Sequence, residues 1–466
     1  MNKRIMIAGT NSGCGKTTVT CAILQALVNR GVSVSSFKCG PDYIDPIFHS
    51  RIIGSDSHNL DSWFCDKDTL NFILNNSNDE MAVLEGVMGF YDGVGGNGSS
   101  YRTAVDTNTP VAIVIDCKGM SSSVGAVMKG FLTFKKPNNI VGFIFNRLPE
   151  SLVGTAKGFC EEMNAEYLGR MPYNSNLSIE SRHLGLVTDV ETDVLKSKVN
   201  QLANLAEENI FIDKLIQISE NSEPVKYRKP DIKRVTKRNV RIALSCDEAF
   251  CFCYRDNIDL LEKSGCEIVK FSPLRDKKLP ENIDGLILVG GYPELYAKEL
   301  SGNKSMLADI KKRISSGLPT IAECGGFMYL HKELESACGE LFPMVGVIDG
   351  TCFKTSKLQR FGYVEITAES DNLLCKKGEA LKAHEFHYWD STDSGNGFTA
   401  KKASSAVTYK CVHSTPSLYA GYPHLYFYAN TECAFNFVKK CEEYGENEKS
   451  KINNSARFRG DEKSRN

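Results

Sequence analysis

The chain has 466 residues, which is enough for two or three domains at ~100–200 residues each. Hydrophobic residues make up 42% of it and charged residues 24%, and 56 basic against 57 acidic residues leave a formal net charge of −1. This is the profile of a globular protein with sizeable cores, and it excludes a general electrostatic attraction to nucleic acid or to anionic membranes.

The first ten residues, MNKRIMIAGT, contain only one strand's worth of apolar side chains. A secretory signal needs an apolar region of roughly 7–15 residues, and a membrane span needs about 18. We therefore expect a cytoplasmic protein whose 17 cysteines are reduced thiols. The cysteines are scattered and form no pair of CxxC motifs, so a structural zinc site is not expected.

Strand-like and helix-like segments alternate from residue 1 to about 215. A helix is expected over 17–29, because its apolar residues share one face and Gly31 can end it. Strands are expected over 4–8, 32–37, 81–85, 111–116 and 140–146. Such alternation predicts a parallel sheet covered on both faces, in a first domain of residues 1–219.

Residues 220–239 are polar and basic with two prolines, which favours a solvated linker over a nucleic-acid contact. Alternation then resumes, with strands expected over 240–245, 267–271, 285–289 and 320–323, and a helix over 307–316. Residues 345–420 have more strand and turn character. The second domain is expected to cover 240–445, and the polar residues 446–466 are expected to be a disordered tail.

The sequence GTNSGCGKTT at 9–18 follows the first predicted strand and opens the first predicted helix. Its glycines let backbone N–H groups surround phosphate oxygens at a helix N-terminus. Lys16 can then reach the β and γ phosphates, and the Thr17 hydroxyl can bind Mg²⁺. The strict phosphate-loop pattern has a glycine where this chain has Thr10, and the first glycine comes one residue early, at Gly9.

Four acids follow predicted strands of the first domain. Asp42 and Asp45 come after the second strand, Glu85 ends the third, and Asp92 lies just beyond it. Because the carboxyl ends of parallel strands share one rim, we expect these acids and Lys38 to converge beside the phosphates. The sequence does not sort them into metal ligands and substrate contacts.

The sequence TIAECGGFM at 320–328 predicts a strand that ends at Cys324 and a tight glycine turn into a helix. The helix N-terminus favours a reactive thiolate, and the N–H of Gly325 would point at an oxyanion. The loop at 288–294, which contains Gly291, could supply the second oxyanion donor. A thiolate nucleophile needs a base, and the candidates are His424 and its rivals His384 and His387.

Many motifs together resemble one known family, the cobyrinic acid a,c-diamide synthases, which are glutamine-dependent amidotransferases of cobalamin biosynthesis. The resemblance spans roughly residues 3–440 and is carried by AGTNSGCGKTTVT, FKCGPDYIDPIFH, NLDSWF, LEGVMGFYDG, FNRLPES, ESRHLGLV, FCFCYRDNIDLLE, VGGYPELYA, AECGGFMYL, HEFHYWD and GYPHLYFY. It implies an α/β fold, with a phosphate-loop parallel-sheet domain like dethiobiotin synthetase followed by a flavodoxin-like class I glutamine amidotransferase domain.

The resemblance also implies roles for single residues. Cys324 would be the nucleophile, His424 its base, and Gly291 and Gly325 the oxyanion donors. Glu85 and Asp92 would be metal-binding or catalytic acids. The implied ATP contacts are Thr10, Gly13, Gly15, Lys16, Thr17 and Thr18, with Asn146 and Arg147 near the adenine. The implied substrate contacts are Lys38, Asp42, Tyr43 and Ile44, and the implied Mg²⁺ ligands are Thr17, Asp45 and Glu85.

The implied reaction is ATP-dependent amidation of the a- and c-acetate carboxylates of cobyrinic acid through an acyl phosphate, with ammonia from glutamine. The implied cofactor is Mg²⁺, and the implied partners are small molecules, namely glutamine, ATP and the tetrapyrrole, with neither nucleic acid nor a membrane; the sequence does not give the oligomeric state. The same motifs would suit nickel sirohydrochlorin or hydrogenobyrinic acid. A cobyric acid synthase and a partition-type nucleotide switch with a degenerate amidotransferase domain are the more distant alternatives. Many class I amidotransferases have an acid two residues after the histidine, where this chain has Tyr426, so the Cys–His pair acts alone or with an acid from elsewhere.

Overall fold

The protein divides into two compact units in the computed structural model, which describes residues 3–174, 177 and 189–463. The first unit is Met1–Pro230 and the second is Asp231–Asn466. Their boundary falls in the segment 221–239, which has neither helix nor strand.

In the described part of the first unit, seven strands form one sheet in the order β3-β2-β4-β1-β5-β6-β7. Every neighbouring pair is parallel. The strands are β1 (Lys3–Gly9), β2 (Val34–Cys39), β3 (Asp56–Leu60), β4 (Met81–Glu85), β5 (Val111–Asp116), β6 (Ile140–Asn146) and β7 (Glu166–Met171).

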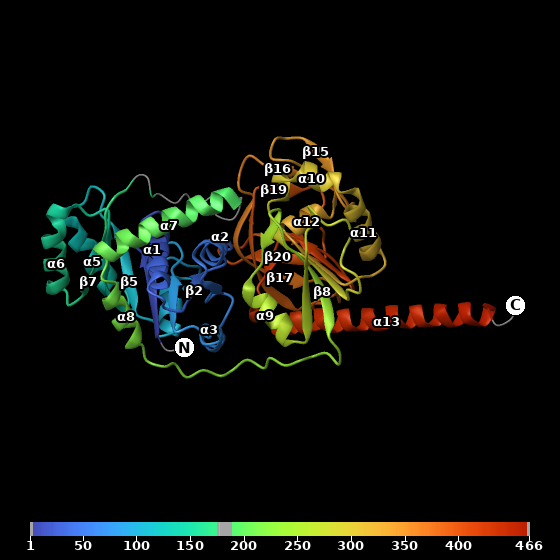
Figure 1. Ribbon diagram of the computed structural model, residues 1–466, viewed down its shortest axis with the longest axis horizontal. Helices are drawn as coiled ribbons and strands as arrows, with labels where there is room; N and C mark the ends of the chain where they lie inside the picture. Colours follow the sequence, from blue (N-terminus) through green and yellow to red (C-terminus); the bar gives the residue numbers. More distant parts are fainter. Residues whose placement is uncertain (1–2, 175–176, 178–188, 464–466) are drawn as a thin grey trace. The chain divides into compact units, whose positions relative to one another are not determined.

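Helices cover this sheet on both faces, as the sequence predicts. Ile5 and Ile7 of β1 pack in one core with helices α1, α7 and α8, while Met6, on the opposite face, is also fully buried. Figure 1 shows α1 and α7 running together along the sheet. The helices are α1 (Lys16–Asn29), α2 (Ile44–Phe48), α3 (Lys67–Leu74), α4 (Ser100–Asp106), α5 (Ser123–Thr133), α6 (Val153–Glu162), α7 (Asp189–Asn209) and α8 (Ile212–Glu220), with the short helices η1 (His49–Ile53) and η2 (Glu150–Leu152).

In the described part of the second unit, a sheet of six strands has the order β10-β8-β11-β13-β23-β22. Its first five strands are parallel and β22 is antiparallel. The strands are β8 (Val240–Ser245), β10 (Cys266–Phe271), β11 (Gly285–Leu288), β13 (Thr320–Glu323), β22 (His413–Thr415) and β23 (Leu418–Gly421). This parallel core with helices agrees with the predicted flavodoxin-like architecture.

Residues 331–425 add the strand-rich part that the sequence indicated. One sheet has the order β21-β20-β17-β18-β24 and another β15-β14-β16-β19; earlier in the unit, β12 pairs with β9. These strands are β9 (Phe250–Phe252), β12 (Gly290–Gly291), β14 (His331–Glu335), β15 (Leu341–Pro343), β16 (Ile348–Lys354), β17 (Arg360–Ala368), β18 (Ala380–His387), β19 (Trp389–Ser391), β20 (Phe398–Lys402), β21 (Thr408–Cys411) and β24 (His424–Leu425).

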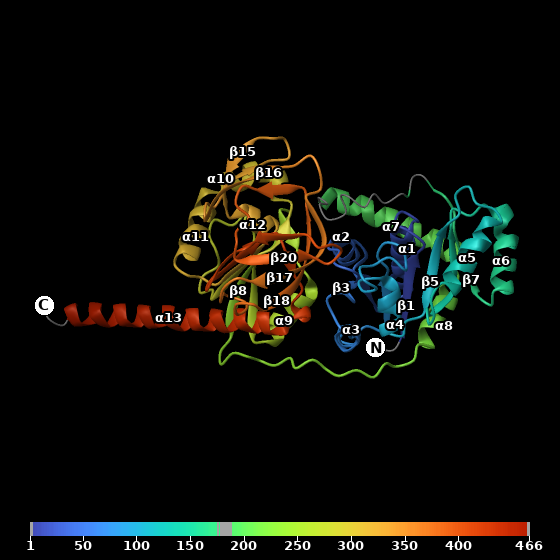
Figure 2. The ribbon, with the colours of Figure 1, turned by 180° about the vertical axis from the view of Figure 1, so that it is seen from behind.

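The C-terminal helix differs from its prediction. The helices of this unit are α9 (Arg255–Lys263), α10 (Ala297–Gly302), α11 (Lys304–Ser315), α12 (Gly325–Tyr329) and α13 (Thr431–Lys463), with η5 (Pro293–Leu295) and η6 (Phe427–Ala429). Helix α13 continues through the segment expected to be a disordered tail from residue 446, and Figure 2 draws it as one helix. The Glu and Lys residues of that segment have good helix propensity, so a helix already begun at Thr431 can extend through it.

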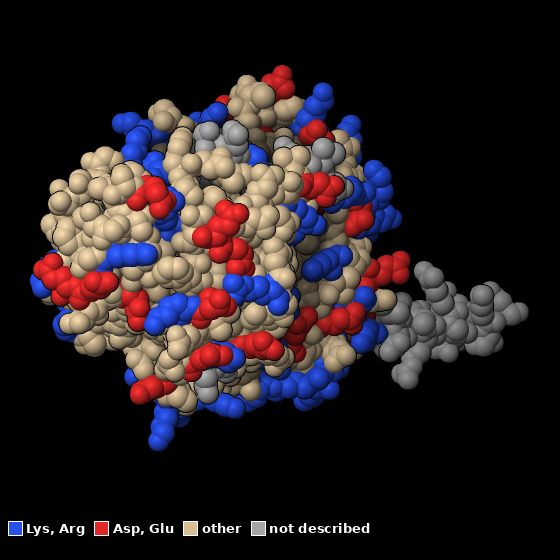
Figure 3. All heavy atoms as spheres, turned by 60° about the vertical axis from the view of Figure 1, so that its left-hand side comes forward, with Lys and Arg blue, Asp and Glu red and all other residues tan. Residues whose placement is uncertain are grey.

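The surface agrees with the near-zero net charge. On the face drawn in Figure 3, acidic and basic side chains are interspersed rather than gathered by sign. Among the described residues, no helix combines the length and apolar character needed to cross a membrane.

Candidate active sites

The phosphate loop joins the end of β1 to the start of α1. Gly13 and Gly15 have φ of 81° and 89°, in the left-handed region that glycine adopts without strain. A Cβ at Gly15 would lie 2.1 Å from the Asn146 side-chain nitrogen, which donates to the Cys14 carbonyl oxygen at 2.9 Å. The early glycine, Gly9, is also required by close packing, because a Cβ there would lie 2.4 Å from the Cys14 sulfur.

A cavity of about 340 Å³ opens at this loop. Seven of the eight predicted ATP contacts line it: Gly13, Gly15, Lys16, Thr17, Thr18, Asn146 and Arg147. Thr10 is not among the lining residues, and its backbone N–H donates instead to the Val114 carbonyl oxygen at 3.1 Å. The cavity therefore extends from the glycine loop to the end of β6.

The far end of the cavity contains residues that sequence reasoning missed. Met171 ends β7, Pro172, Tyr173 and Asn174 follow it, and Leu202 and Leu205 come from α7. Arg147, which also lines the cavity, donates its Nε–H to Asp116 Oδ1 at 2.7 Å, and this contact fixes its side chain. Strand β7 could have revealed these residues. The carboxyl ends of parallel strands share one rim, so a strand predicted here would have placed the loop that follows it beside the phosphate loop.

A buried charge cluster lies next to the loop. Lys38 of β2 and Glu85 of β4 are register partners, with Nζ 2.9 Å from Oε1. The Lys38 ammonium also pairs closely with Asp45 and lies 4.0 Å from Asp42. The Thr17 hydroxyl donates to the same Glu85 Oε1 at 2.6 Å, so the cluster is continuous with the phosphate loop.

Opposite charges in this cluster stabilise Lys38 and Glu85 in their charged forms, whereas burial and like charges disfavour the charged forms of Asp45 and Lys16. Burial lowers the pKa of Lys38, but the carboxylates of Asp45 and Glu85 raise it above its usual value. Burial raises the pKa of Glu85, but Lys38 and His49 hold it below its usual range. Burial and the Glu85 charge raise the pKa of Asp45 to about 7. Burial and the Lys38 charge lower the pKa of Lys16.

Three of the four predicted acids therefore gather around Lys38, and the fourth lies apart. Asp92 is exposed, and its Oδ2 accepts from the Gly89 N–H at 2.9 Å. The adjacent Phe90 N–H donates to the Gly9 carbonyl oxygen at 2.8 Å, so this turn still packs on the phosphate loop. Of the predicted substrate contacts, Ile44 donates its N–H to Asp42 Oδ1 at 2.8 Å at the start of α2, and Tyr43 is buried.

The cysteine elbow of the second unit joins β13 to α12. Cys324 has φ of 48° and ψ of −105°, a backbone conformation that is strained for a residue with a side chain and typical of a functional site. Its N–H donates to the Gly421 carbonyl oxygen at 2.8 Å. A Cβ at Gly326 would lie 2.1 Å from the Leu288 carbonyl oxygen, so only glycine fits this turn.

Gly291 and Gly325 lie against each other beside this cysteine. A Cβ at Gly325 would lie 2.9 Å from the Gly291 nitrogen, and a Cβ at Gly291 would lie 2.1 Å from the Ala249 carbonyl oxygen. A Cβ at Gly290 would lie 2.6 Å from Cε1 of His424. The arrangement therefore brings two backbone N–H groups, a thiol and an imidazole to one place.

The three candidate histidines differ in their surroundings. Burial lowers the pKa of His384 and of His387 to about 3, so both are neutral. His387 also stacks on Tyr422 and bonds to the Trp389 carbonyl oxygen at 2.6 Å. Burial lowers the pKa of His424 too, but Cys324 and Glu323 raise it to about 10. His424 is thus the histidine paired with Cys324.

Comparison with known proteins decides the family. Residues 5–187 match the CobQ/CobB/MinD/ParA nucleotide binding domain, and residues 241–432 match the CobB/CobQ-like glutamine amidotransferase domain. The chain is 37% identical over 453 residues to the cobyrinate a,c-diamide synthase of Caldanaerobacter subterraneus, covering 96% of this chain and 100% of the relative. It is 39% identical over 442 residues to that of Listeria innocua, covering 92% and 97%.

The chain belongs to the cobyrinate a,c-diamide synthase family. It is therefore a carbon–nitrogen ligase that takes nitrogen from glutamine, as the sequence predicts. The predicted fold, a phosphate-loop parallel-sheet domain followed by an amidotransferase domain, is also confirmed. The motif ESRHLGLV of this family, at 180–187, lies outside the described residues.

The donors beside the phosphate loop fit a magnesium ion. Thr17 Oγ1 and Glu85 Oε1 are hard oxygen ligands 2.6 Å apart at the loop, and the Asp45 carboxylate lies in the same cluster.

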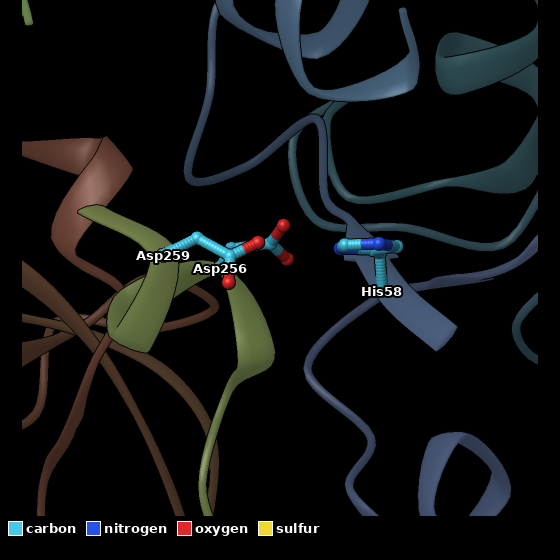
Figure 4. Close-up of side chains that lie close together, drawn as sticks. All are labelled: His58, Asp256 and Asp259. Carbon is cyan, nitrogen blue, oxygen red and sulfur yellow. The ribbon is translucent and has the colours of Figure 1, made fainter. Parts of the chain in front are cut away.

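Other acids gather elsewhere: Asp256 and Asp259 project from α9 (Figure 4). His58, drawn in the same figure, belongs to the first unit.

Proposed function

We propose that this protein uses ATP to amidate the a- and c-acetate carboxylates of cobyrinic acid, with ammonia released from glutamine. A carboxylate is a poor acyl donor, because its leaving group would be oxide. Transfer of the ATP γ-phosphoryl group to the carboxylate gives an acyl phosphate with a good leaving group. Ammonia then displaces phosphate and leaves the amide. The names of the relatives support cobyrinic acid as the substrate.

In the first unit, the backbone N–H groups of the phosphate loop and Lys16 would hold the phosphates, and Asn146 and Arg147 would lie near the adenine. Thr17, Asp45 and Glu85 would hold Mg²⁺, which when bound neutralises phosphate charge during the transfer. Lys38, Asp42, Tyr43 and Ile44 would contact the tetrapyrrole. The Lys38 ammonium supports this role, since it keeps the carboxylate cluster from repelling an anionic substrate.

In the second unit, Cys324 would attack the side-chain amide of glutamine. The N–H groups of Gly291 and Gly325 would hold the oxyanion, and His424 would pass a proton to the departing ammonia. Water then releases glutamate from the thioester. Ammonia made in this way is neutral at the moment of release, whereas ammonia from solution is almost all ammonium at pH 7. We propose that it passes to the acyl phosphate within the protein.

The proposal is supported most by the Cys324–His424 pair beside Gly291 and Gly325, in a chain that also carries the phosphate-loop cavity. Cys324→Ala tests this division of labour. We expect the variant to lose synthesis with glutamine and to keep synthesis with ammonium salts. Glutamine-driven synthesis that survives Cys324→Ala would contradict it.

The ring is tested separately. The protein is incubated with Mg-ATP, glutamine and, in parallel, cobyrinic acid, hydrogenobyrinic acid or nickel sirohydrochlorin, and the products are weighed by mass spectrometry. We expect cobyrinic acid to gain two amides, with release of ADP and glutamate. Amidation of another ring alone would keep the mechanism and replace the substrate. Binding of ATP without amidation of any ring would favour the nucleotide-switch alternative.

A further inference from the structure

The position where many class I amidotransferases have an acid is used differently in this protein. Tyr426, two residues after His424, donates its hydroxyl to Asp256 Oδ2 at 3.0 Å. Asn257, the next residue of α9, accepts from the Phe427 N–H at 2.7 Å and donates to the Leu425 carbonyl oxygen at 2.8 Å. The chain after His424 is therefore fastened to α9, and no carboxylate stands at this position.

Another carboxylate lies against His424. Glu323 Oε2 is 3.6 Å from His424 Nδ1, and Glu323 Oε1 accepts from the Leu425 N–H at 3.0 Å. The Glu323 residue is 8% exposed, so water screens this pair little. Glu323 is also the residue directly before Cys324, at the end of β13.

We propose that Glu323 is the positioning acid of the Cys324–His424 pair. One carboxylate oxygen fixes the backbone next to His424, while the other faces Nδ1 and leaves Nε2 for the cysteine. The Nδ1–Oε2 distance is longer than a hydrogen bond, and catalytic hydrogen bonds often tighten only when substrate is bound. Since Glu323 and Cys324 are consecutive, the strained elbow that presents the sulfur also places the carboxylate.

Among the titratable groups near the Glu323 carboxylate, His424 is the one that its charge favours in a charged form. Cys253, Tyr419 and Cys433 also lie close enough to feel Glu323, but burial raises the pKa of each of them, so they stay neutral. Glu323 and Cys324 raise the pKa of His424 as well, and for an imidazole a raised pKa favours the cationic form. A carboxylate on one side of the imidazolium and a thiolate on the other would stabilise the ion pair that attacks glutamine.

Glu323→Gln tests the proposal, because the amide oxygen can still accept from the Leu425 N–H while the charge facing His424 is lost. Glu333→Gln is the matched control: Glu333 lies in the same unit and accepts from the Thr351 hydroxyl at 3.2 Å, as a glutamine also can. For Glu323→Gln we expect kcat with glutamine to fall by about 10-fold to 100-fold, with little change in the KM for glutamine and an unchanged rate with ammonium.

A second readout separates positioning from simple packing. Iodoacetamide labelling of the Cys324 peptide, followed by mass spectrometry over a range of pH, reports the thiolate of this one cysteine. We expect the labelling midpoint to rise by about one pH unit in Glu323→Gln and to stay in place in Glu333→Gln. Glu323→Asp, whose carboxylate is one methylene shorter, should restore part of the lost rate.

The inference depends on the proposed roles of Cys324 and His424, so Cys324→Ser and His424→Asn are measured alongside. If either keeps glutamine-dependent synthesis, the proposed function of the pair fails. If both lose it while Glu323→Gln keeps the wild-type kcat and labelling midpoint, only the role of Glu323 is overturned. A Glu323→Gln variant that also loses the ammonium rate would show a structural role instead and would equally overturn it.

Discussion

Lys38 and Glu85 are paired twice in the first unit, once through the backbone and once through their side chains. Their Cα atoms are register partners on the adjacent parallel strands β2 and β4, and Nζ lies 2.9 Å from Oε1. Glu85 is fully buried and Lys38 is 3% exposed. The ion pair therefore lies at the carboxyl rim of the sheet, away from water, beside the loop that would hold phosphate.

Lys38→Met should destabilise the first unit strongly, because it leaves the Asp45 and Glu85 carboxylates buried without their cation. Breaking a buried pair in this way costs about 3–5 kcal/mol. Thermal unfolding followed through Trp63 on a Trp389→Phe background measures the effect. The control is Lys3→Met, since the Lys3–Glu220 pair is exposed and should contribute little. Equal losses in the two variants would contradict this account of the cluster.

Gly15→Ala should abolish ATP binding. The new Cβ would lie 2.1 Å from the Asn146 side chain, and the φ of 89° is strained for alanine. The backbone N–H groups of the loop would therefore be displaced from the phosphates, and we expect ATP affinity measured by calorimetry to fall more than about 100-fold. Gly154→Ala in α6, where a Cβ has open space, is the control and should bind ATP normally.

The sequence predicted β4 and β13 to the residue because both are short apolar runs between turn signals. It missed β3, whose residues DSHNL are mostly polar and yet almost entirely buried. Ser57 and Asn59 of this strand are satisfied by tertiary partners, the Ser36 hydroxyl at 2.8 Å and the Gly40 carbonyl oxygen at 3.0 Å. Such partners cannot be inferred from hydrophobic periodicity.

In the candidate sites, too, the sequence predicted residues that are neighbours in the chain and missed a residue whose partner is brought close only by folding. Motifs drew attention to Lys16, Cys324 and His424, because a glycine turn and its reactive residue are neighbours in the chain. The carboxylate of Glu323 was overlooked although it precedes Cys324, since its partner His424 is far along the sequence. Only the pairing of β13 with β23, where Glu323 lies opposite Gly421, brings the two residues together.

His331 should make the second unit less stable in acid. Burial lowers the pKa of His331 to about 4, below the value of about 6.5 in the unfolded chain. Between these values the unfolded state binds more protons, so stability falls as pH drops from 6.5 to 4, by ~1.4 kcal/mol per pH unit for this residue. His331→Gln should reduce this slope in denaturant unfolding followed through Trp389 on a Trp63→Phe background. An unchanged slope would show that His331 is not buried as a neutral group.

Gly325→Ala should separate the two activities of the protein. A Cβ there would lie 2.9 Å from both the Gly291 nitrogen and Pro293 Cδ, so it would push apart the two backbone segments proposed to hold the oxyanion. Loss of one oxyanion donor costs about 100-fold to 1,000-fold in kcat, and we expect a loss of that size with glutamine.

With ammonium salts the Gly325→Ala variant should keep its rate, because that route needs only the first unit. Gly302→Ala, at a glycine of the same unit where a Cβ meets nothing within 4 Å, is the control and should keep both rates. The two rates are compared by mass spectrometry of the amidated ring. Parallel losses of both would contradict the assignment of Gly325, since they would mean that the substitution acts on folding rather than on the oxyanion.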